Sequence, residues 1–145
     1  MFVRARVLSA TLALATAGFV VTIGRAPVAA EQAAAAPTGP VFEIRTYVAS
    51  AGKLDALHTR FRDHTIRIFA RHGIESIAYW IPDNQRNTLV YIIKHESREA
   101  APLNWKAFLS DPEWVKVAAA SNVDGNIVAR VESYFASAAD YSPIK

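Results

Sequence analysis

The sequence predicts one α+β domain in which a four-stranded antiparallel sheet carries helices on a single face. Two observations support this fold class. Stretches of strand and helix periodicity follow one another in the order strand, helix, strand, strand, helix pair, strand, and turn-forming residues separate them. This order is the split β-α-β plan, which usually places the last strand beside the first and antiparallel to it. Residues 41–136 form the predicted domain, and residues 137–145 form its C-terminal tail.

Residues 1–30 have the three parts of a secretory signal peptide. Arg4 and Arg6 give a basic start, Val7–Gly24 carries no charge, and a run of small residues ends at Ala30. We therefore expect cleavage after Ala30 and export to the periplasm or the medium. An uncleaved membrane anchor is the first alternative, because the uncharged run is long enough to span a bilayer. A mitochondrial presequence is less favoured, since such segments are amphipathic.

The composition of the mature chain limits the classes of partner that we expect it to bind. Of the 16 Lys and Arg residues three precede residue 31, and of the 13 acidic residues only Glu31 precedes Val41, so 13 basic and 12 acidic residues remain in 41–145. This balance gives no support to nucleic-acid binding. The chain has no cysteine, which excludes disulfides and cysteine nucleophiles. Residues 31–40 are rich in small residues and predict a flexible spacer.

Val41–Val48 predicts the first strand, and its alternation separates two unlike faces. One face is mainly apolar and is expected to pack against the helices; it comprises Phe42, Ile44, Thr46 and Val48. The other face comprises Val41, Glu43, Arg45 and Tyr47. A carboxylate, a guanidinium and a phenol at alternate positions can line a polar cavity. We therefore expect the second face to carry the chemistry of this domain.

A long helix and a hairpin follow the first strand. Lys53–His72 predicts the helix, which ends at Gly73. Its apolar positions recur at helical spacing, and the opposite side is expected to face solvent; that side comprises Arg60, Asp63, Arg67 and Arg71. Ile74–Ile81 and Thr88–His95 predict two strands, and the turn residues between them favour a hairpin.

Two shorter helices precede the last strand. Ser97 can cap the first, but Pro102 lies too deep for an unbroken helix that starts there, so we expect either a kink or a restart near Ala101. Asp111–Glu113 gives a strong start signal for the second helix, because it combines a capping acid, a proline at the first helical position and an acid near the positive end of the helix dipole. Ile127–Phe135 alternates as the fourth strand.

The fourth strand also has a polar face, comprising Arg130, Glu132 and Tyr134. Because this strand is expected beside the first, its polar face is predicted to oppose that of the first strand, with complementary charges in reach across the ladder. Both polar faces are expected to point away from the helices. Dimerisation through the open face of the sheet is one way to cover it.

An ordered set of short motifs resembles the NIPSNAP family. The set comprises Phe42–Tyr47, the Gly52-Lys53 turn, Phe61, Arg62 and His64, then His72–Ile74 followed by Tyr79-Trp80, and finally Trp105, Phe108 and Asp111–Trp114. The resemblance extends over about Val41–Tyr134, with Pro102 as a departure from the helix that family members place there. It implies a ferredoxin-like fold of the dimeric α/β-barrel type, in which two sheets pack face to face around a cavity. That wider group includes small monooxygenases, isomerase-like proteins and haem enzymes.

The candidate ligand-binding residues are those expected to line this barrel cavity: Glu43, Arg45, Tyr47, Tyr79, Trp80, Arg130, Glu132 and Tyr134. Three residues are candidates for catalysis. Arg45 can hold a carboxylate or enolate, Tyr47 can donate a hydrogen bond to an oxyanion, and His64 can act as a general base. The alternative is that Glu43 pairs with Arg130, and Arg45 with Glu132, only to satisfy a dimer interface.

The sequence contains no motif that indicates a metal site or a cofactor site. The histidines of the long helix, His58, His64 and His72, are not spaced four residues apart as metal ligands on a helix are. The chain has neither a nucleotide-binding glycine loop nor a convincing axial ligand for haem. We therefore expect no metal and no cofactor.

The sequence leaves three functions open. The first is an exported homodimer that binds a small organic or apolar ligand in the barrel cavity, with no assigned reaction. The second is a cofactor-free monooxygenase or isomerase, and the third is a non-enzymatic interaction module. Contact with a membrane is expected only if the N-terminal segment is uncleaved.

Overall fold

A computed structural model of the chain describes residues 39–145. The predicted signal peptide, residues 1–30, and nearly all of the spacer lie outside the described residues. Within the described part, no helix is long and apolar enough to cross a membrane.

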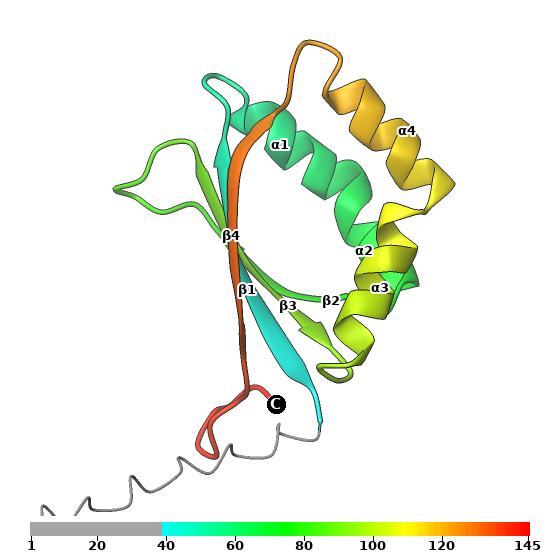
Figure 1. Cartoon of the computed structure of the whole chain (residues 1–145). Coiled ribbons are helices and arrows are strands. Elements are labelled where there is room, and N and C mark those ends of the chain that lie inside the picture. Colours follow the sequence, from blue (N-terminus) through cyan, green and yellow to red (C-terminus); the bar gives the residue numbers. More distant parts are fainter. Residues whose placement is uncertain (1–38) are drawn as a thin grey trace, which may run out of the picture. The chain divides into compact units, whose positions relative to one another are not determined.

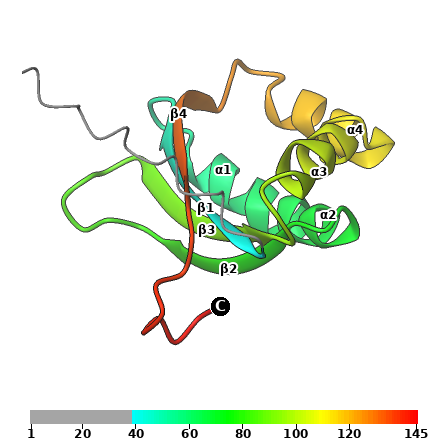
Figure 2. The same cartoon turned by 60° about the horizontal axis from the view of Figure 1, so that its bottom comes forward.

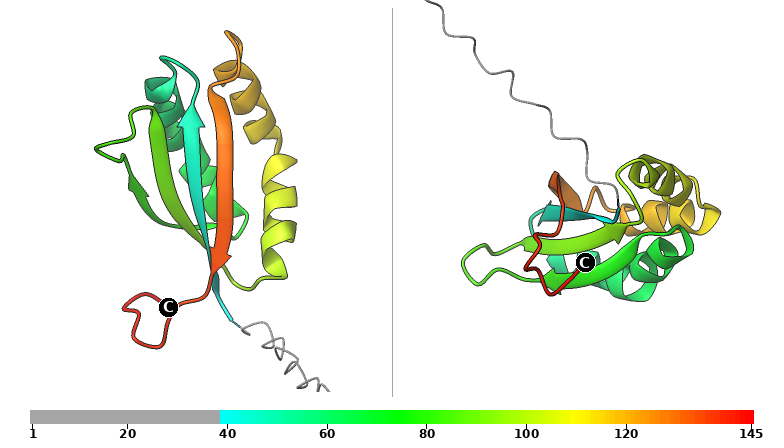
Figure 3. Two further views of the ribbon diagram at one scale, coloured as in Figure 1. Left: turned by 60° about the vertical axis from the view of Figure 1, so that its left-hand side comes forward. Right: turned by 90° about the horizontal axis from the view of Figure 1, so that it is seen from below.

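The domain contains four strands, one long helix and two shorter helices in the predicted order. Its elements are β1 (Val41–Ala49), α1 (Leu54–Arg60), η1 (Phe61–Thr65), α2 (Ile66–Arg71), β2 (Glu75–Trp80), β3 (Thr88–His95), α3 (Ala100–Leu109), α4 (Pro112–Ser121) and β4 (Val128–Ala136). The sheet is antiparallel with the strand order β2-β3-β1-β4. All helices lie on one side of it (Figures 1 and 2). The predicted ferredoxin-like α+β fold is confirmed, including β4 beside β1, as Figure 3 shows.

The long helix is continuous from Leu54 to Arg71 but contains one wide turn. The segment η1 is π-helical: the Ile66 N–H donates to the Phe61 carbonyl, and Thr65 Oγ1 donates to the Arg60 carbonyl at 3.1 Å. Such turns occur mostly as single insertions in α-helices and often at functional sites. The helix ends as predicted, because Gly73 has a φ of 69° and lets the Ile74 N–H donate to the Phe69 carbonyl at 3.0 Å.

The start signals of the two shorter helices are confirmed. Helix α3 begins at Ala100, so Pro102 lies in the first turn, where a backbone N–H would lack a helical acceptor in any case. Asp111 caps α4, since its side chain accepts hydrogen bonds from the backbone N–H groups of Glu113 and Trp114 at 2.8 and 3.3 Å.

The core lies between the sheet and the helices. The helix from Leu54 to Arg71 buries an apolar stripe against alternate residues of β3, and α3 contributes Phe108; the main members are Leu57, Phe61, Ile68, Phe69, Leu89, Tyr91 and Ile93. Phe61 makes edge contacts with Tyr91 and Phe69, whose ring centroids lie 5.1 and 6.3 Å away. Edge-to-face packing of this kind stabilises aromatic cores beyond the burial of surface.

The predicted assignment of the two faces of β1 is wrong. Glu43, Arg45 and Tyr47 pair in register with Ile93, Tyr91 and Leu89, which are all buried under the helices. The polar residues of β1 therefore lie on the covered face of the sheet, and Phe42 and Ile44 lie on the open face. The physical reason is that these polar groups satisfy one another, which removes the cost of burying them.

The predicted pairing between the polar residues of β1 and β4 is also wrong. Glu43 lies opposite Phe135, Arg45 opposite Ser133 and Tyr47 opposite Val131. Arg130, Glu132 and Tyr134 consequently lie on the open face, and Arg130 Nε approaches Glu132 Oε1 at 3.3 Å on the same strand. A shift of one residue in register exchanges the faces of a whole strand, and the sequence does not reveal this parity.

Candidate functional site

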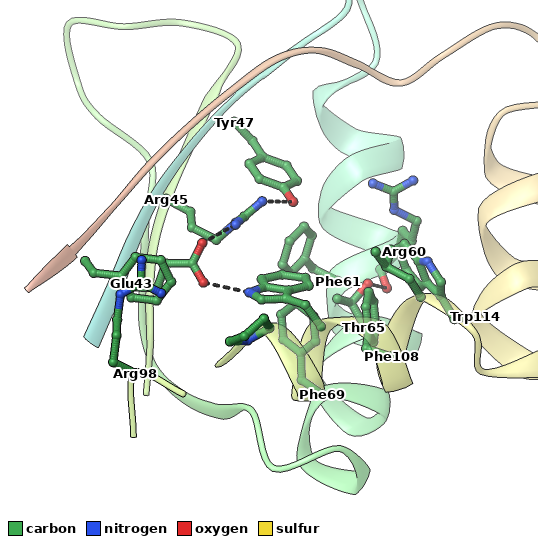
Figure 4. Close-up of a pocket in the computed structure, with 14 residues that line it drawn as sticks. Glu43, Arg45, Tyr47, Arg60, Phe61, Thr65, Phe69, Arg98, Phe108 and Trp114 are labelled. Carbon is green, nitrogen blue, oxygen red and sulfur yellow. Dashed lines mark hydrogen bonds and ion pairs between the residues drawn. The ribbon is translucent and has the colours of Figure 1, made fainter. Parts of the chain in front are cut away.

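A cavity of about 410 Å³ lies between the covered face of the sheet and the helices. Figure 4 shows Glu43, Arg45 and Tyr47 on the sheet side, and Arg60, Thr65 and most of the aromatic residues on the helix side. The polar lining residues are Glu43, Arg45, Tyr47, Arg60, Thr65 and Arg98, and the apolar ones are Phe61, Phe69, Pro102, Trp105, Phe108, Leu109, Trp114 and Phe135. We call this space the central cavity.

Arg45 is held from several sides at the sheet side of the central cavity. Its Nη1 forms an ion pair with Glu43 Oε1, its Nε donates to the Tyr91 hydroxyl at 2.9 Å, and its Nη2 donates to the Tyr47 hydroxyl at 3.2 Å. The guanidinium also lies 4.4 Å from the ring centroid of Trp105. Burial opposes the charge of Arg45, but Tyr91, Tyr47 and Glu43 outweigh it and raise the pKa above its ordinary value. Arg45 is thus a permanent cation with fixed geometry.

Glu43 is the counter-ion of Arg45 and is only 2% exposed. Its Oε2 accepts hydrogen bonds from Trp105 Nε1 at 2.7 Å and from His95 Nε2 at 3.3 Å. Burial favours the neutral carboxyl, but the hydrogen bonds from His95 and Trp105 and the charge of Arg45 outweigh it, so the pKa of Glu43 falls to about 2. The carboxylate therefore stays ionised at neutral pH.

His95 connects this cluster to α3. Its ring is fully buried, and Asn104 Nδ2 lies 3.3 Å from its Nδ1. An amide nitrogen can only donate, so Nδ1 is the acceptor and the proton resides on Nε2, facing Glu43. Both ring nitrogens of His95 are engaged, and the histidine orients Glu43 without contacting the central cavity.

Arg60 enters the central cavity from the helix side, in contrast to the prediction that it faces solvent. The side chain is buried, with 7% of the residue exposed, because α4 packs over this end of α1. Its Nη1 donates to Ser121 Oγ at 3.1 Å, and its guanidinium lies 5.2 Å from the ring centroid of Trp114. Within residues 39–145 its Nε has no acceptor, and no carboxylate is within ion-pair distance. Burial lowers the pKa of Arg60.

A second, shallower space lies between α1 and α4. This groove has a volume of about 520 Å³ and is lined by Ala56, Thr59, Arg60, His64, Lys116, Val117, Ala120 and Ser121. His64 lines the groove and not the central cavity, so the structure separates it from Arg45 and Tyr47. Arg60 borders both spaces. Basic residues line the groove, and no acidic residue does.

The structure brings together three of the predicted ligand-binding residues, Glu43, Arg45 and Tyr47. Tyr79 lies on the same covered face, where its ring stacks on Tyr91 at 5.5 Å, but it does not line the central cavity. The remaining predicted residues lie on the open face: Trp80, Arg130, Glu132 and Tyr134.

Sequence reasoning missed Arg60 and the polar role of Trp105. Two signals pointed to them. Arg60 directly precedes Phe61 of the buried stripe, and a buried tryptophan needs an acceptor for its indole N–H, which Glu43 supplies.

Comparison with known proteins identifies the fold and a family. The family model described as NIPSNAP matches residues 42–143. A NIPSNAP domain protein from Burkholderia xenovorans has 21% identity and a TM-score of 0.61, with 71% of this chain and 98% of that chain covered. A NIPSNAP family protein of unknown function from Agrobacterium tumefaciens has 23% identity and a TM-score of 0.64, covering 74% and 96%.

The same fold occurs in an oxygenase. SnoaB, a cofactor-independent oxygenase from Streptomyces nogalater, has 17% identity and a TM-score of 0.51, with 72% of this chain and 98% of that chain covered. No curated protein sequence matches the chain. At these identities the likeness to solved structures establishes the fold.

Proposed function

Since the chain belongs to the NIPSNAP family, we propose that it is a binding protein that holds a small, largely apolar organic molecule in the central cavity. The observation that carries this proposal is the polar cluster of Glu43, Arg45 and Tyr47, which is prearranged at one side of a cavity with aromatic walls. Pockets of about 300 to 1,000 Å³ with few, well-placed polar groups are typical of small-molecule sites. The proposed site therefore lies between the helices and the covered face of the sheet, and not on the open face.

A neutral fluorescent probe, N-phenyl-1-naphthylamine, tests this proposal. Leu109 lines the central cavity and is 57% exposed, so Leu109→Trp fills the site without disturbing the core. Leu103→Trp is the matched control, because Leu103 lies on the same helix, is 67% exposed and does not line the cavity. We expect saturable fluorescence with the wild type and the control, and about tenfold weaker binding to Leu109→Trp. Equal binding to all three proteins would place the probe elsewhere.

We further propose that two copies associate through the open face of the sheet. This face carries the partly exposed Ile44, Val90 and Ile92 and the exposed Trp80, which the helices do not cover, whereas Phe42 on the same face is only 8% exposed. A contiguous apolar surface of this kind favours association. Ile92→Glu should convert the dimer to a monomer in sedimentation velocity, whereas Val123→Glu, in an exposed loop, should not. The interaction-module hypothesis loses its original support, because the polar residues of β1 lie under the helices.

Cofactor-independent oxygenation is the second candidate, favoured by the shared fold with SnoaB. Arg45 and Tyr47 can stabilise the anion of an activated carbonyl compound, which then reacts with O₂. With anthrone as the probe, O₂ oxidises one CH₂ group to a carbonyl. One oxygen atom of O₂ becomes the carbonyl oxygen, and the other is released as water. Protein-dependent O₂ consumption should fall in Tyr47→Phe and persist in His64→Ala. Consumption no faster than the background would contradict this activity.

Export completes the proposal. The basic start, the uncharged run and the small residues before Glu31 support it. The intact mass of material from the periplasm or the medium should correspond to a chain that starts at Glu31. Full-length chains in a membrane fraction would establish an anchor instead.

A further inference from the structure

We infer that the ligand of the central cavity is an organic acid whose carboxylate pairs with Arg60. This inference rests on the proposed binding function and specifies the chemical class of the ligand. Its basis is that Arg60 is a buried cation for which the described residues supply no counter-ion.

The use of hydrogen-bond donors distinguishes Arg60 from Arg45, which also lines the central cavity. A guanidinium has five N–H donors. Arg45 directs its donors to a carboxylate and two hydroxyls, whereas Arg60 donates only from Nη1, to the neutral Ser121 Oγ. The Nε of Arg60 is shielded from solvent and has no acceptor in residues 39–145. A buried charge without a counter-ion is costly, and a ligand carboxylate would remove that cost.

The charge around Arg60 also favours an anion. The central cavity is lined by three arginines, Arg45, Arg60 and Arg98, and by one acid, Glu43, which Arg45 already neutralises. The adjoining groove adds His64 and Lys116 and no acid. The combined field of the two spaces is therefore positive, and it attracts anions and repels cations.

The position of Arg60 sets the orientation of the acid. Because Arg60 borders both the central cavity and the groove, a carboxylate bound to it lies at their junction. The apolar part of the molecule then extends along Phe61, Phe108 and Trp114 of the central cavity (Figure 4). A planar aromatic acid fits this division, since guanidinium groups bind carboxylates in a fork and aromatic rings pack on aromatic walls.

Matched ligands test the inference. Titration calorimetry would compare 2-naphthoate with 2-naphthalenemethanol, which has the same ring system and no charge. We expect the wild type to bind the acid about 10- to 100-fold more tightly, the range expected for hydrogen bonds to a charged group. Arg60→Gln should remove this preference, so that the variant binds the acid and the alcohol with equal affinity. Arg60→Lys should retain part of the preference, because it keeps the charge and loses the fork.

Arg62→Gln is the matched control, because Arg62 lies two residues away, carries the same charge and is exposed. It should retain the full preference for the acid. Equal affinities of the wild type for acid and alcohol would overturn the inference and leave the proposed binding function intact. A preference that survives Arg60→Gln would also overturn it, by moving the anion to Arg45 or Arg98. If neither compound binds the wild type, the inference fails together with the binding function.

Discussion

Two arginines line the central cavity, the half-buried Arg45 and the buried Arg60, and they differ in almost every contact. Arg45, on β1, has an anionic partner and two hydroxyl acceptors, whereas Arg60, at the end of α1, has one hydroxyl and the face of an indole. The described residues supply Arg45 with a counter-ion and hydrogen-bond acceptors, whereas they supply Arg60 with no counter-ion. The difference separates an arginine that builds the site from one that is available to recognise something in it.

The largest expected effect on stability comes from replacing Arg45. Arg45→Met leaves the Glu43 carboxylate buried without its cation, and we expect the free energy of unfolding to fall by about 3 to 5 kcal/mol. Urea denaturation followed by circular dichroism measures this change. Arg62→Met, an exposed control, should change stability by no more than about 0.5 kcal/mol. A loss below 1 kcal/mol for Arg45→Met would show that the ion pair does not organise the cavity.

Acid should also weaken the folded protein through the Glu43–Arg45 pair. The pKa of Glu43 is lowered in the folded protein, so its stabilising contribution is complete above the ordinary carboxyl pKa and is lost as the pH falls toward about 2. Between pH 7 and pH 3 the wild type should therefore lose about 2 kcal/mol more unfolding free energy than Glu43→Gln. Denaturation at the two pH values measures the difference. Glu132→Gln, on the open face, should behave as the wild type does; equal slopes for all three proteins would contradict the assignment.

A smaller loss of stability is expected when Trp105 of α3, which contacts the Glu43–Arg45 pair, is replaced. Trp105→Phe keeps most of the ring and removes the indole N–H that donates to Glu43, so the free energy of unfolding should fall by about 1 to 2 kcal/mol. Chemical denaturation of this variant should also show weaker acid sensitivity between pH 7 and pH 3, since Glu43 loses one donor that lowers its pKa in the folded protein. Trp114→Phe is the comparison, because Trp114 lies on the opposite side of the cavity.

The smallest effect on stability should come from replacing Arg60. Arg60→Leu removes a buried cation for which residues 39–145 supply no counter-ion, and we expect stability to be unchanged or to rise by up to about 1 kcal/mol. Thermal unfolding in ligand-free buffer measures it. A loss above 2 kcal/mol would show that Arg60 is satisfied in the folded protein and would remove the distinction between the two arginines.

The order and ends of the elements were predictable because local chemistry determines them. Gly73 ends the long helix at a left-handed position, and Asp111 caps α4 through its own side chain. The faces of the sheet were not predictable in the same way. Alternation divides β1 into two faces, but only the buried partners on β3, such as Tyr91, determine which face the helices cover.

The candidate site was predictable in part for the same reason. Glu43, Arg45 and Tyr47 share one face of a strand, so their grouping follows from sequence alone. Arg60 was placed with Arg67 and Arg71 because a regular helical period assigns it to the solvent side, and the π-helical turn is a departure from that period. His95 carries no signal, since its role depends on an amide from another helix.

The position of Arg60 relative to α2 depends on one extra residue in the wide turn at η1. A π-helical turn contains one residue more than an α-helical turn, and one residue corresponds to a rotation of about 100° around the helix axis. Loss of one codon within 61–65 would restore a regular helix and rotate α1, with Arg60 and Leu57, by about 100° relative to α2. Among homologous chains, the length of this short segment would then distinguish cavities with a helix-side arginine from cavities without one.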